Sequence, residues 1–173
     1  MKSCMEVMLT RRSVKRYTSE MPSREDIEKI LEAGLAAASG RNMQASVIVA
    51  VTNKEIRDRL SQDNAAVMGA SADPFYNAPC VLVVLAEKSA HTYVYDGSLT
   101  LGNMMLAAHE LGLGSCWIHR AKEVMAKPDW QEWIKSLGLS GEYEGIGNLV
   151  VGYPDGELPA AKERREGRIV YVD

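Results

Sequence analysis

A run of cationic and hydroxyl side chains near the amino terminus is the clearest candidate in this sequence for binding a ligand. Residues 11–16 read Arg-Arg-Ser-Val-Lys-Arg and follow a short apolar segment. A second basic pair, Lys162 and Arg164, comes after the Gly-Tyr-Pro at 152–154. Arginine binds phosphate through paired hydrogen bonds, and lysine binds it as a point charge. We therefore expect the two basic segments to hold one phosphorylated ligand if they meet in space.

The first basic segment also has a simpler interpretation. Cations that follow a short helix complement the negative end of its dipole and can remain in solvent without binding a ligand. A nucleic-acid-binding patch is disfavoured, because no wider basic face accompanies the cluster and the net charge of the chain is −3. A solvated basic segment and a phosphate-binding segment therefore both stay open.

Two further loops carry groups that suit a ligand. Residues 39–44, Ser-Gly-Arg-Asn-Met-Gln, offer a hydroxyl, two amides and a cation, which match the edge of a heterocycle with several donors and acceptors. Residues 112–120, Gly-Leu-Gly-Ser-Cys-Trp-Ile-His-Arg, have glycines that let the backbone pass close to a ligand. An ordinary polar connection and a tight turn into a core strand are the alternatives.

The usual catalytic sets are missing from the sequence. No Gly-x-Ser-x-Gly elbow surrounds Ser39 or Ser115, and the three histidines show no metal-ligand spacing. Cys116 is expected to be a buried strand thiol rather than a nucleophile. Binding groups without an obvious nucleophile or base indicate that a bound cofactor carries the reaction.

The apolar pattern predicts one α+β domain over residues 1–173, in which 46% of residues are hydrophobic and 25% are charged. Helices are expected at 3–9, 53–60, 95–113 and 128–137. A further helix is expected to start at the capping box formed by residues 23–26. Strands are expected at 47–51, 78–85, 115–118 and 147–152, with an edge strand at 167–172. The strand at 47–51 is expected to be covered on both faces, and residues 61–77 to be irregular.

The sequence shows no segment that would direct the chain to a membrane. Its longest apolar run, residues 78–86, is too short to cross a bilayer, and no signal-peptide pattern is seen at the start. Three cysteines without a Cys-x-x-Cys pair argue against a disulfide framework. A reducing cytoplasm is the expected location, with neither membrane nor nucleic acid as a partner.

Taken in order, these motifs resemble those of the nitroreductase family of flavoproteins. The match covers nearly the whole chain: Arg-Arg-Ser-x-Lys at 11–15, the segment 38–44, Pro-Phe-Tyr-Asn-Ala-Pro at 74–79, the long helix ending at 111–118, and Gly-Tyr-Pro with the tail pair. Ala38 and Ala45 replace prolines that are usual in the family's Pro-Ser-x-x-Asn-x-Gln-Pro loop.

The resemblance implies a nitroreductase-like α+β fold, with a central mixed, mainly antiparallel sheet flanked by helices. It further implies an intertwined homodimer with one FMN in each of two interfacial pockets. NAD(P)H would be the co-substrate, and a nitroaromatic, quinone or similar small acceptor would be reduced by ping-pong hydride transfer. The alternatives are an FMN-binding carrier, sensor or electron shuttle without NAD(P)H turnover, and a different flavin-dependent reaction on the same fold.

The resemblance also assigns site residues by position. The phosphate and ribityl chain would be held by Arg11, Arg12, Ser13, Lys162 and Arg164. Lys15 would lie near the pyrimidine edge and stabilise reduced flavin. The partner subunit would supply Ser39, Gly40, Asn42 and Gln44, and backbone groups near the ring or phosphate would come from Trp117, Ile118 and His119. The helix 95–113 would be a dimer element, and the segment 63–76 would form a lid.

Overall fold

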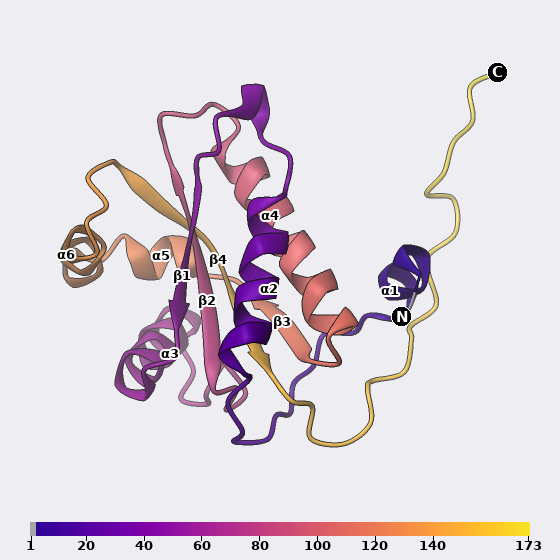
Figure 1. Ribbon diagram of the computed structural model, residues 1–173, viewed down its shortest axis with the longest axis horizontal. Coiled ribbons are helices and arrows are strands. Elements are labelled where there is room, and N and C mark those ends of the chain that lie inside the picture. The colour runs from indigo at the N-terminus through magenta and orange to yellow at the C-terminus, as the bar shows by residue number, and fades with distance from the viewer. Residues whose placement is uncertain (1–2) are drawn as a thin grey trace.

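A four-stranded sheet lies at the centre of the computed structural model, which describes residues 3–173 (Figure 1). The strand order is β1-β2-β4-β3, and all neighbouring strands are antiparallel. The strands are β1 (Ser46–Val51), β2 (Cys80–Glu87), β3 (Gly114–Ile118) and β4 (Tyr143–Gly152). A single parallel bridge joins Ser13 to Ser115 at the β3 edge. The expected mainly antiparallel sheet is thus confirmed, and its four strands are all antiparallel.

Helices cover both faces of the sheet (Figure 1). One face carries α2 (Arg24–Leu35) and α4 (Tyr93–Glu110), and the other carries α3 (Lys54–Met68), α5 (Ala121–Met125) and α6 (Pro128–Ser136). The short helix α1 (Cys4–Thr10) lies beside the end of α4, and one 3₁₀ turn, η1 (Gly40–Asn42), precedes β1. The structure is therefore a sheet between two helical layers.

The central strand β2 explains why two cores form. Its residues from Cys80 to Ala86 are all completely buried. Successive side chains of a strand point to opposite faces. Val81 and Val83 accordingly pack into the core with α3, α5 and α6, whereas Leu82 and Val84 pack against α2 and α4. A continuous apolar run, rather than an alternating one, is what a strand covered on both faces requires.

Local signals placed the helix starts correctly. The Ser23 hydroxyl accepts a hydrogen bond from the Asp26 amide at 3.0 Å, and the Asn53 side chain accepts one from the Ile56 amide at 3.0 Å. Each satisfies an amide that a helix start leaves without a partner in the helix. The predicted helices at 3–9, 95–113 and 128–137 correspond to α1, α4 and α6 within a few residues.

Three expectations about the elements were wrong, and one helix was missed. β1 is an edge strand in which only Val51 is buried, so it is not covered on both faces. α3 continues to Met68 and ends at the left-handed Gly69, and its buried polar residues Ser61 and Asn64 are hydrogen-bonded to Asp73, His119 and Arg120. Helix α5 was not predicted. Residues 167–172 form no strand in this chain.

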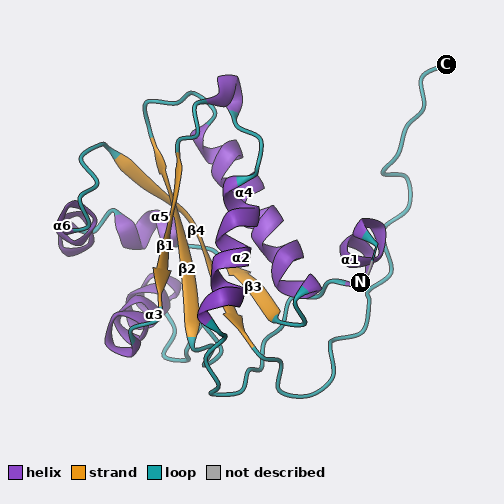
Figure 2. Cartoon of the chain, in the orientation of Figure 1, coloured by secondary structure: helices purple, strands orange, loops and turns teal. Residues whose placement is uncertain are grey.

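The carboxyl-terminal tail is exposed along its whole length. Tyr17 and Pro154 form an antiparallel bridge, and the Asp155 amide donates to the Arg16 carbonyl at 3.0 Å. Residues 155–173 are then all exposed and carry no helix or strand, as the teal trace in Figure 2 shows. Within the described residues, no helix is both long and apolar enough to cross a membrane.

Candidate functional site

The first basic segment lies along the start of β3. The Val14 amide donates to the Ser115 carbonyl at 3.0 Å, next to the parallel bridge of Ser13. Val14 is 4% exposed, and its side chain fills the place where Gly114 has no side chain: an added Cβ would lie 2.9 Å from it. In an extended segment alternate side chains point to opposite sides. With Val14 directed inward, Ser13 and Lys15 are left exposed on the other side.

The two neighbouring arginines behave differently. The Arg12 Nη1 donates to the carbonyls of Leu9 at 2.9 Å and Arg11 at 2.8 Å, so Arg12 complements the carboxyl end of α1. The Arg11 Nη1 is buried and has no hydrogen-bond partner within residues 3–173. A buried donor without a partner costs free energy, which an anionic ligand would recover. The solvated, helix-complementing interpretation thus suits Arg12, and the ligand-binding one suits Arg11.

Cys116 on β3 shows how these cations converge. Burial raises the pKa of its thiol, and a hydrogen bond with Ser13 and the charges of Lys15 and Arg11 lower it only in part. Those three side chains therefore all lie close enough to the Cys116 thiol to influence its pKa. The thiol stays protonated near neutral pH, which agrees with a buried strand thiol rather than a nucleophile. The neighbouring Ser115 hydroxyl is buried and has no partner among the described residues.

Tyr76 joins this cluster, although the sequence did not single out its side chain. The Lys15 ammonium lies 5.8 Å from the centroid of the Tyr76 ring, within the range of a cation–π contact. The phenol of Tyr76 is also close enough to contribute, after burial and Cys116, to a raised pKa of Tyr17. The only sequence signal was the position of Tyr76 inside the Pro-Phe-Tyr-Asn-Ala-Pro motif.

The other end of β3 carries the three predicted backbone contacts. Trp117 is half-buried, and its indole nitrogen has no partner within the described chain; Ile118 is buried. His119 is exposed, and its carbonyl accepts a hydrogen bond from the fully buried Asn64 side chain at 2.9 Å. The Arg120 Nε donates to the same side chain at 3.0 Å, and Arg120 has a left-handed φ of 75°. Asn64 therefore shapes the turn after β3, a role that polarity alone did not reveal.

The loop predicted at 39–44 lies at the amino end of α4. The Gly40 amide donates to the Asp96 carboxylate at 3.1 Å, and the Gln44 amide donates to the Ser39 hydroxyl at 3.0 Å. The Gln44 side chain reaches the Asn42 amide oxygen at 3.1 Å. Left-handed φ values of 49–55° occur at Arg41, Asn42 and Gln44. Such strain in non-glycine residues is typical of functional loops.

One chain does not bring all the predicted residues together. The 39–44 loop is at the start of α4, whereas Thr10, next to Arg11, contacts His109 at its end, with 2.8 Å between Oγ1 and Nε2. A helix of 18 residues is about 27 Å long. Lys162 and Arg164 lie in the exposed tail, which leaves the sheet and passes α1 in Figure 1. Within one chain, the 39–44 loop and Arg11 therefore lie at opposite ends of α4.

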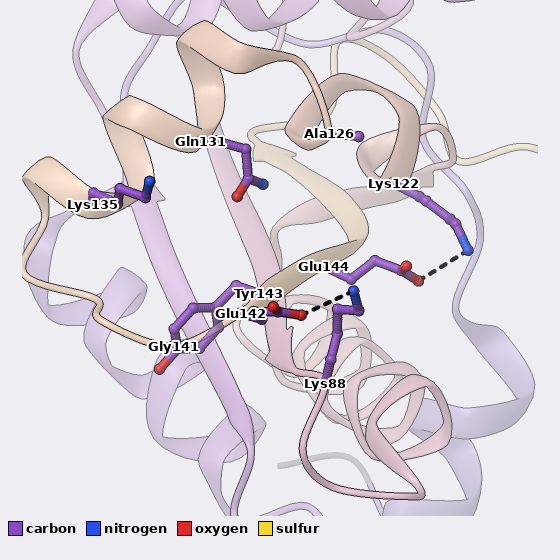
Figure 3. A pocket seen from close by; sticks show the side chains of 9 residues that line it. All are labelled: Lys88, Lys122, Ala126, Gln131, Lys135, Gly141, Glu142, Tyr143 and Glu144. Carbon is purple, nitrogen blue, oxygen red and sulfur yellow. Dashed lines mark hydrogen bonds and ion pairs between the residues drawn. The ribbon is translucent and has the colours of Figure 1, made fainter.

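A hollow on the α5 and α6 side of the sheet does not coincide with the predicted site. It measures about 520 Å³ and lies between α5, α6 and the start of β4 (Figure 3). Its charges largely pair with each other: Lys88 with Glu142 at 3.3 Å, and Lys122 with Glu144 at 3.2 Å. None of the predicted site residues lines it. Three lysines and two glutamates line it, so these two pairs leave one excess positive charge, that of Lys135.

The family is decided by a model of the Nitroreductase family that matches residues 8–153. The chain belongs to this family. A protein of Archaeoglobus fulgidus, whose name combines NADH dehydrogenase with NAD(P)H nitroreductase, is 35% identical over 91% of this chain and 88% of its own length. The NADPH-flavin oxidoreductase of Vibrio harveyi is 29% identical over 98% of this chain and 73% of its own.

Solved structures of this family share the fold. The nitroreductase of Bacteroides fragilis, crystallised with bound FMN, superposes with a TM-score of 0.88 and 28% identity over the full length of both chains. The FMN-dependent nitroreductase of Clostridium difficile gives a TM-score of 0.85 and 26% identity over 99% of each chain. The family resemblance and the fold expected from the sequence are both confirmed.

Proposed function

We propose that this protein is an FMN-dependent NAD(P)H oxidoreductase that reduces small acceptors such as nitroaromatics and quinones. The observation that carries the proposal is the unpartnered, buried Nη1 of Arg11, which lies at the start of the segment that pairs with β3. The buried hydroxyl of Ser115 and the ammonium of Lys15 are offered by the same region. A phosphate and an electron-rich ring edge in one ligand would satisfy all three groups.

Each of these residues has a distinct part in the proposal. Arg11 and Ser13 would bind the phosphate and ribityl chain, and Lys15 would place a positive charge near the ring. Bound FMN would supply the electron-transfer chemistry that links NAD(P)H to an acceptor. A preorganised cation stabilises charge that develops during a reaction without needing to move. No protein nucleophile is required, in keeping with the raised pKa of Cys116.

A homodimer is part of the same proposal. Large apolar side chains are exposed on α4 and in the tail: Tyr95 is 72% exposed, Leu99 is 51% exposed, and Ile169, Val170, Tyr171 and Val172 are 76–95% exposed. An apolar hollow of about 360 Å³ also lies between α1, α2 and α4. Exposed apolar surface on this scale is typical of an interface.

The dimer would also complete the site. In a two-fold dimer each chain offers the same surface to the other. If the two α4 helices run antiparallel, the 39–44 loop of one chain lies beside the carboxyl end of the other chain's α4, close to Arg11 of that chain. The tail of one chain could then add Lys162 and Arg164 to the same phosphate.

A reducing location, proposed as the cytoplasm, is supported by the three free cysteines.

The first test is a visible absorption spectrum of the purified protein, before and after NAD(P)H is added without oxygen. Flavin bands that bleach support the oxidoreductase, and flavin that stays oxidised favours a carrier or sensor. A protein that neither contains FMN nor binds it when supplied would refute the proposal.

The site assignment is tested by replacing Arg11 and Lys162 together with alanine. We expect FMN to be lost from this variant, and unchanged retention would contradict a shared phosphate site. Light scattering measures the assembly. A monomer that still binds FMN tightly would rule out the interfacial site.

A further inference from the structure

The turn that carries Tyr76 has an unfavourable backbone conformation. Tyr76 and Asn77 have φ values of 54° and 58°, so two consecutive non-glycine residues are left-handed. The left-handed conformation is unfavourable for a residue with a Cβ, less so for asparagine than for tyrosine, and it persists only where the surroundings enforce it. The turn therefore needs a specific set of contacts to hold it.

Asp73 provides these contacts. Its carboxylate accepts hydrogen bonds from the amides of Phe75 at 2.8 Å and Asn77 at 2.7 Å, one on each side of Tyr76. It also accepts hydrogen bonds from the Ser61 hydroxyl and from the Arg57 guanidinium, the latter at 2.6 Å. The carboxylate thus fixes both ends of the turn to α3.

Arg57 anchors this carboxylate in the core. The residue is only 8% exposed, and its Nε donates to the Ala78 carbonyl at 3.0 Å. Its guanidinium also lies 5.6 Å from the centroid of the fully buried Phe75 ring. Buried charges are retained only when they are paired and hydrogen-bonded, which is the case here. The turn is therefore fixed at Asp73, Phe75, Asn77 and Ala78, and Tyr76 is left to face Lys15.

The geometry points to Tyr76 as a positioning residue for Lys15. The face of the Tyr76 ring attracts the Lys15 ammonium at 5.8 Å, and so restricts a long, exposed side chain that would otherwise sample many conformations. Asp73 and Arg57 hold the ring in place. Tyr76 thereby sets how strongly Lys15 stabilises the negative charge that FMN gains when it is reduced. This inference rests on the proposed function, because it assumes that FMN binds beside Lys15.

The test compares the reduction potential of bound FMN in Tyr76→Asn and Tyr76→Phe. Asparagine tolerates the left-handed conformation and removes the ring, whereas phenylalanine keeps a ring face for the ammonium. We expect Tyr76→Asn to weaken the preference for reduced over oxidised FMN about three- to tenfold, a fall of about 15–30 mV for a two-electron couple. Tyr76→Phe should retain a potential close to that of the unchanged protein.

A double-variant comparison separates positioning from a general structural effect. Lys15→Ala should lower the potential, and adding Tyr76→Asn to it should lower the potential no further, because Tyr76 acts through Lys15. The affinity for oxidised FMN, measured by fluorescence titration, should change less than the potential. Asp73→Asn, which keeps the size of the side chain, should reproduce part of the effect of Tyr76→Asn.

The outcomes distinguish this inference from the function on which it rests. An unshifted potential in a Tyr76→Asn protein that still binds FMN and is reduced by NAD(P)H would overturn the inference alone. Additive effects of Lys15→Ala and Tyr76→Asn would do the same. A parent protein that binds no FMN would overturn the proposed function and the inference together.

Discussion

Replacing Arg57 with leucine should destabilise the protein substantially. The change removes the 2.6 Å partner of Asp73, leaves the Ala78 carbonyl without its 3.0 Å donor, and takes away the contact with the Phe75 ring. The Arg57 and Asp73 side chains are 9% and 24% exposed. Solvent therefore cannot fully replace what is lost.

The size of the effect follows from the remaining contacts of Asp73. Breaking a buried ion pair by removing one partner costs about 3–5 kcal/mol. Asp73 keeps the Ser61 hydroxyl and two backbone amides, so we expect a loss of about 3 kcal/mol, at the lower end of that range. For a chain of 173 residues this corresponds to a fall in Tm of about 6–12 °C.

Urea denaturation at a fixed protein concentration, followed by circular dichroism, measures this loss. The matched control is Arg59→Leu, two positions further along α3. The side chain of Arg59 is 49% exposed, and it pairs at 3.0 Å with Asp129, which is 78% exposed. An exposed pair of this kind contributes about 1 kcal/mol or less, and the Arg59 guanidinium, 4.6 Å from the centroid of the Trp130 ring, adds a cation–π contact of about 0.5–1 kcal/mol. A loss in Arg57→Leu no larger than in Arg59→Leu would refute the role of the buried pair.

Three other predictions concern pH, packing and the tail. Burial raises the pKa of Asp73, but its hydrogen bonds outweigh this and leave the pKa below its usual value. Its stabilisation is thus present above about pH 4 and lost as the pH falls through the folded-state pKa. The stability gap between the parent and Asp73→Asn should shrink in acid, and a gap that stays constant from pH 7 to below the folded-state pKa would contradict this. Gly114→Ala would place its Cβ 2.9 Å from the Val14 side chain and displace the basic segment. FMN should then bind about tenfold more weakly by equilibrium dialysis, a loss of about 1.4 kcal/mol, and unchanged affinity would argue against that packing. Replacing both Lys162 and Arg164 with alanine should weaken FMN binding more than replacing two neighbouring cations, Arg165 and Arg168, with alanine. Equal losses of affinity would indicate a general charge effect.

The helices with local start signals were predictable because the signals lie within a few residues of each other. Ser23 and Asp26, or Asn53 and Ile56, are three positions apart, and their hydrogen bonds join residues within a single helical turn. The continuous apolar run that became β2 was equally informative, because burial on both faces requires it.

The extent of α3 was not predictable in the same way. Residues 61–77 were expected to be irregular, but Ser61 and Asn64 lie in α3, are buried, and are hydrogen-bonded to groups distant in the sequence: Asp73, His119 and Arg120. A polar residue within a helix is stable in the core only when such partners exist, and no local pattern reports them. The edge position of β1 likewise depends on strand order rather than on composition.

The sequence by itself determined the family, through motifs whose residue types and order are read directly, and the cation set that suits a phosphate. Only the tertiary structure decided which of those cations lacks a partner, that Tyr76 lies against Lys15 although 61 positions separate them, and that the 39–44 loop lies at the opposite end of α4 from Arg11. The physical reason is that such proximity comes from packing helices and strands around shared cores, and those contacts join residues far apart in the chain.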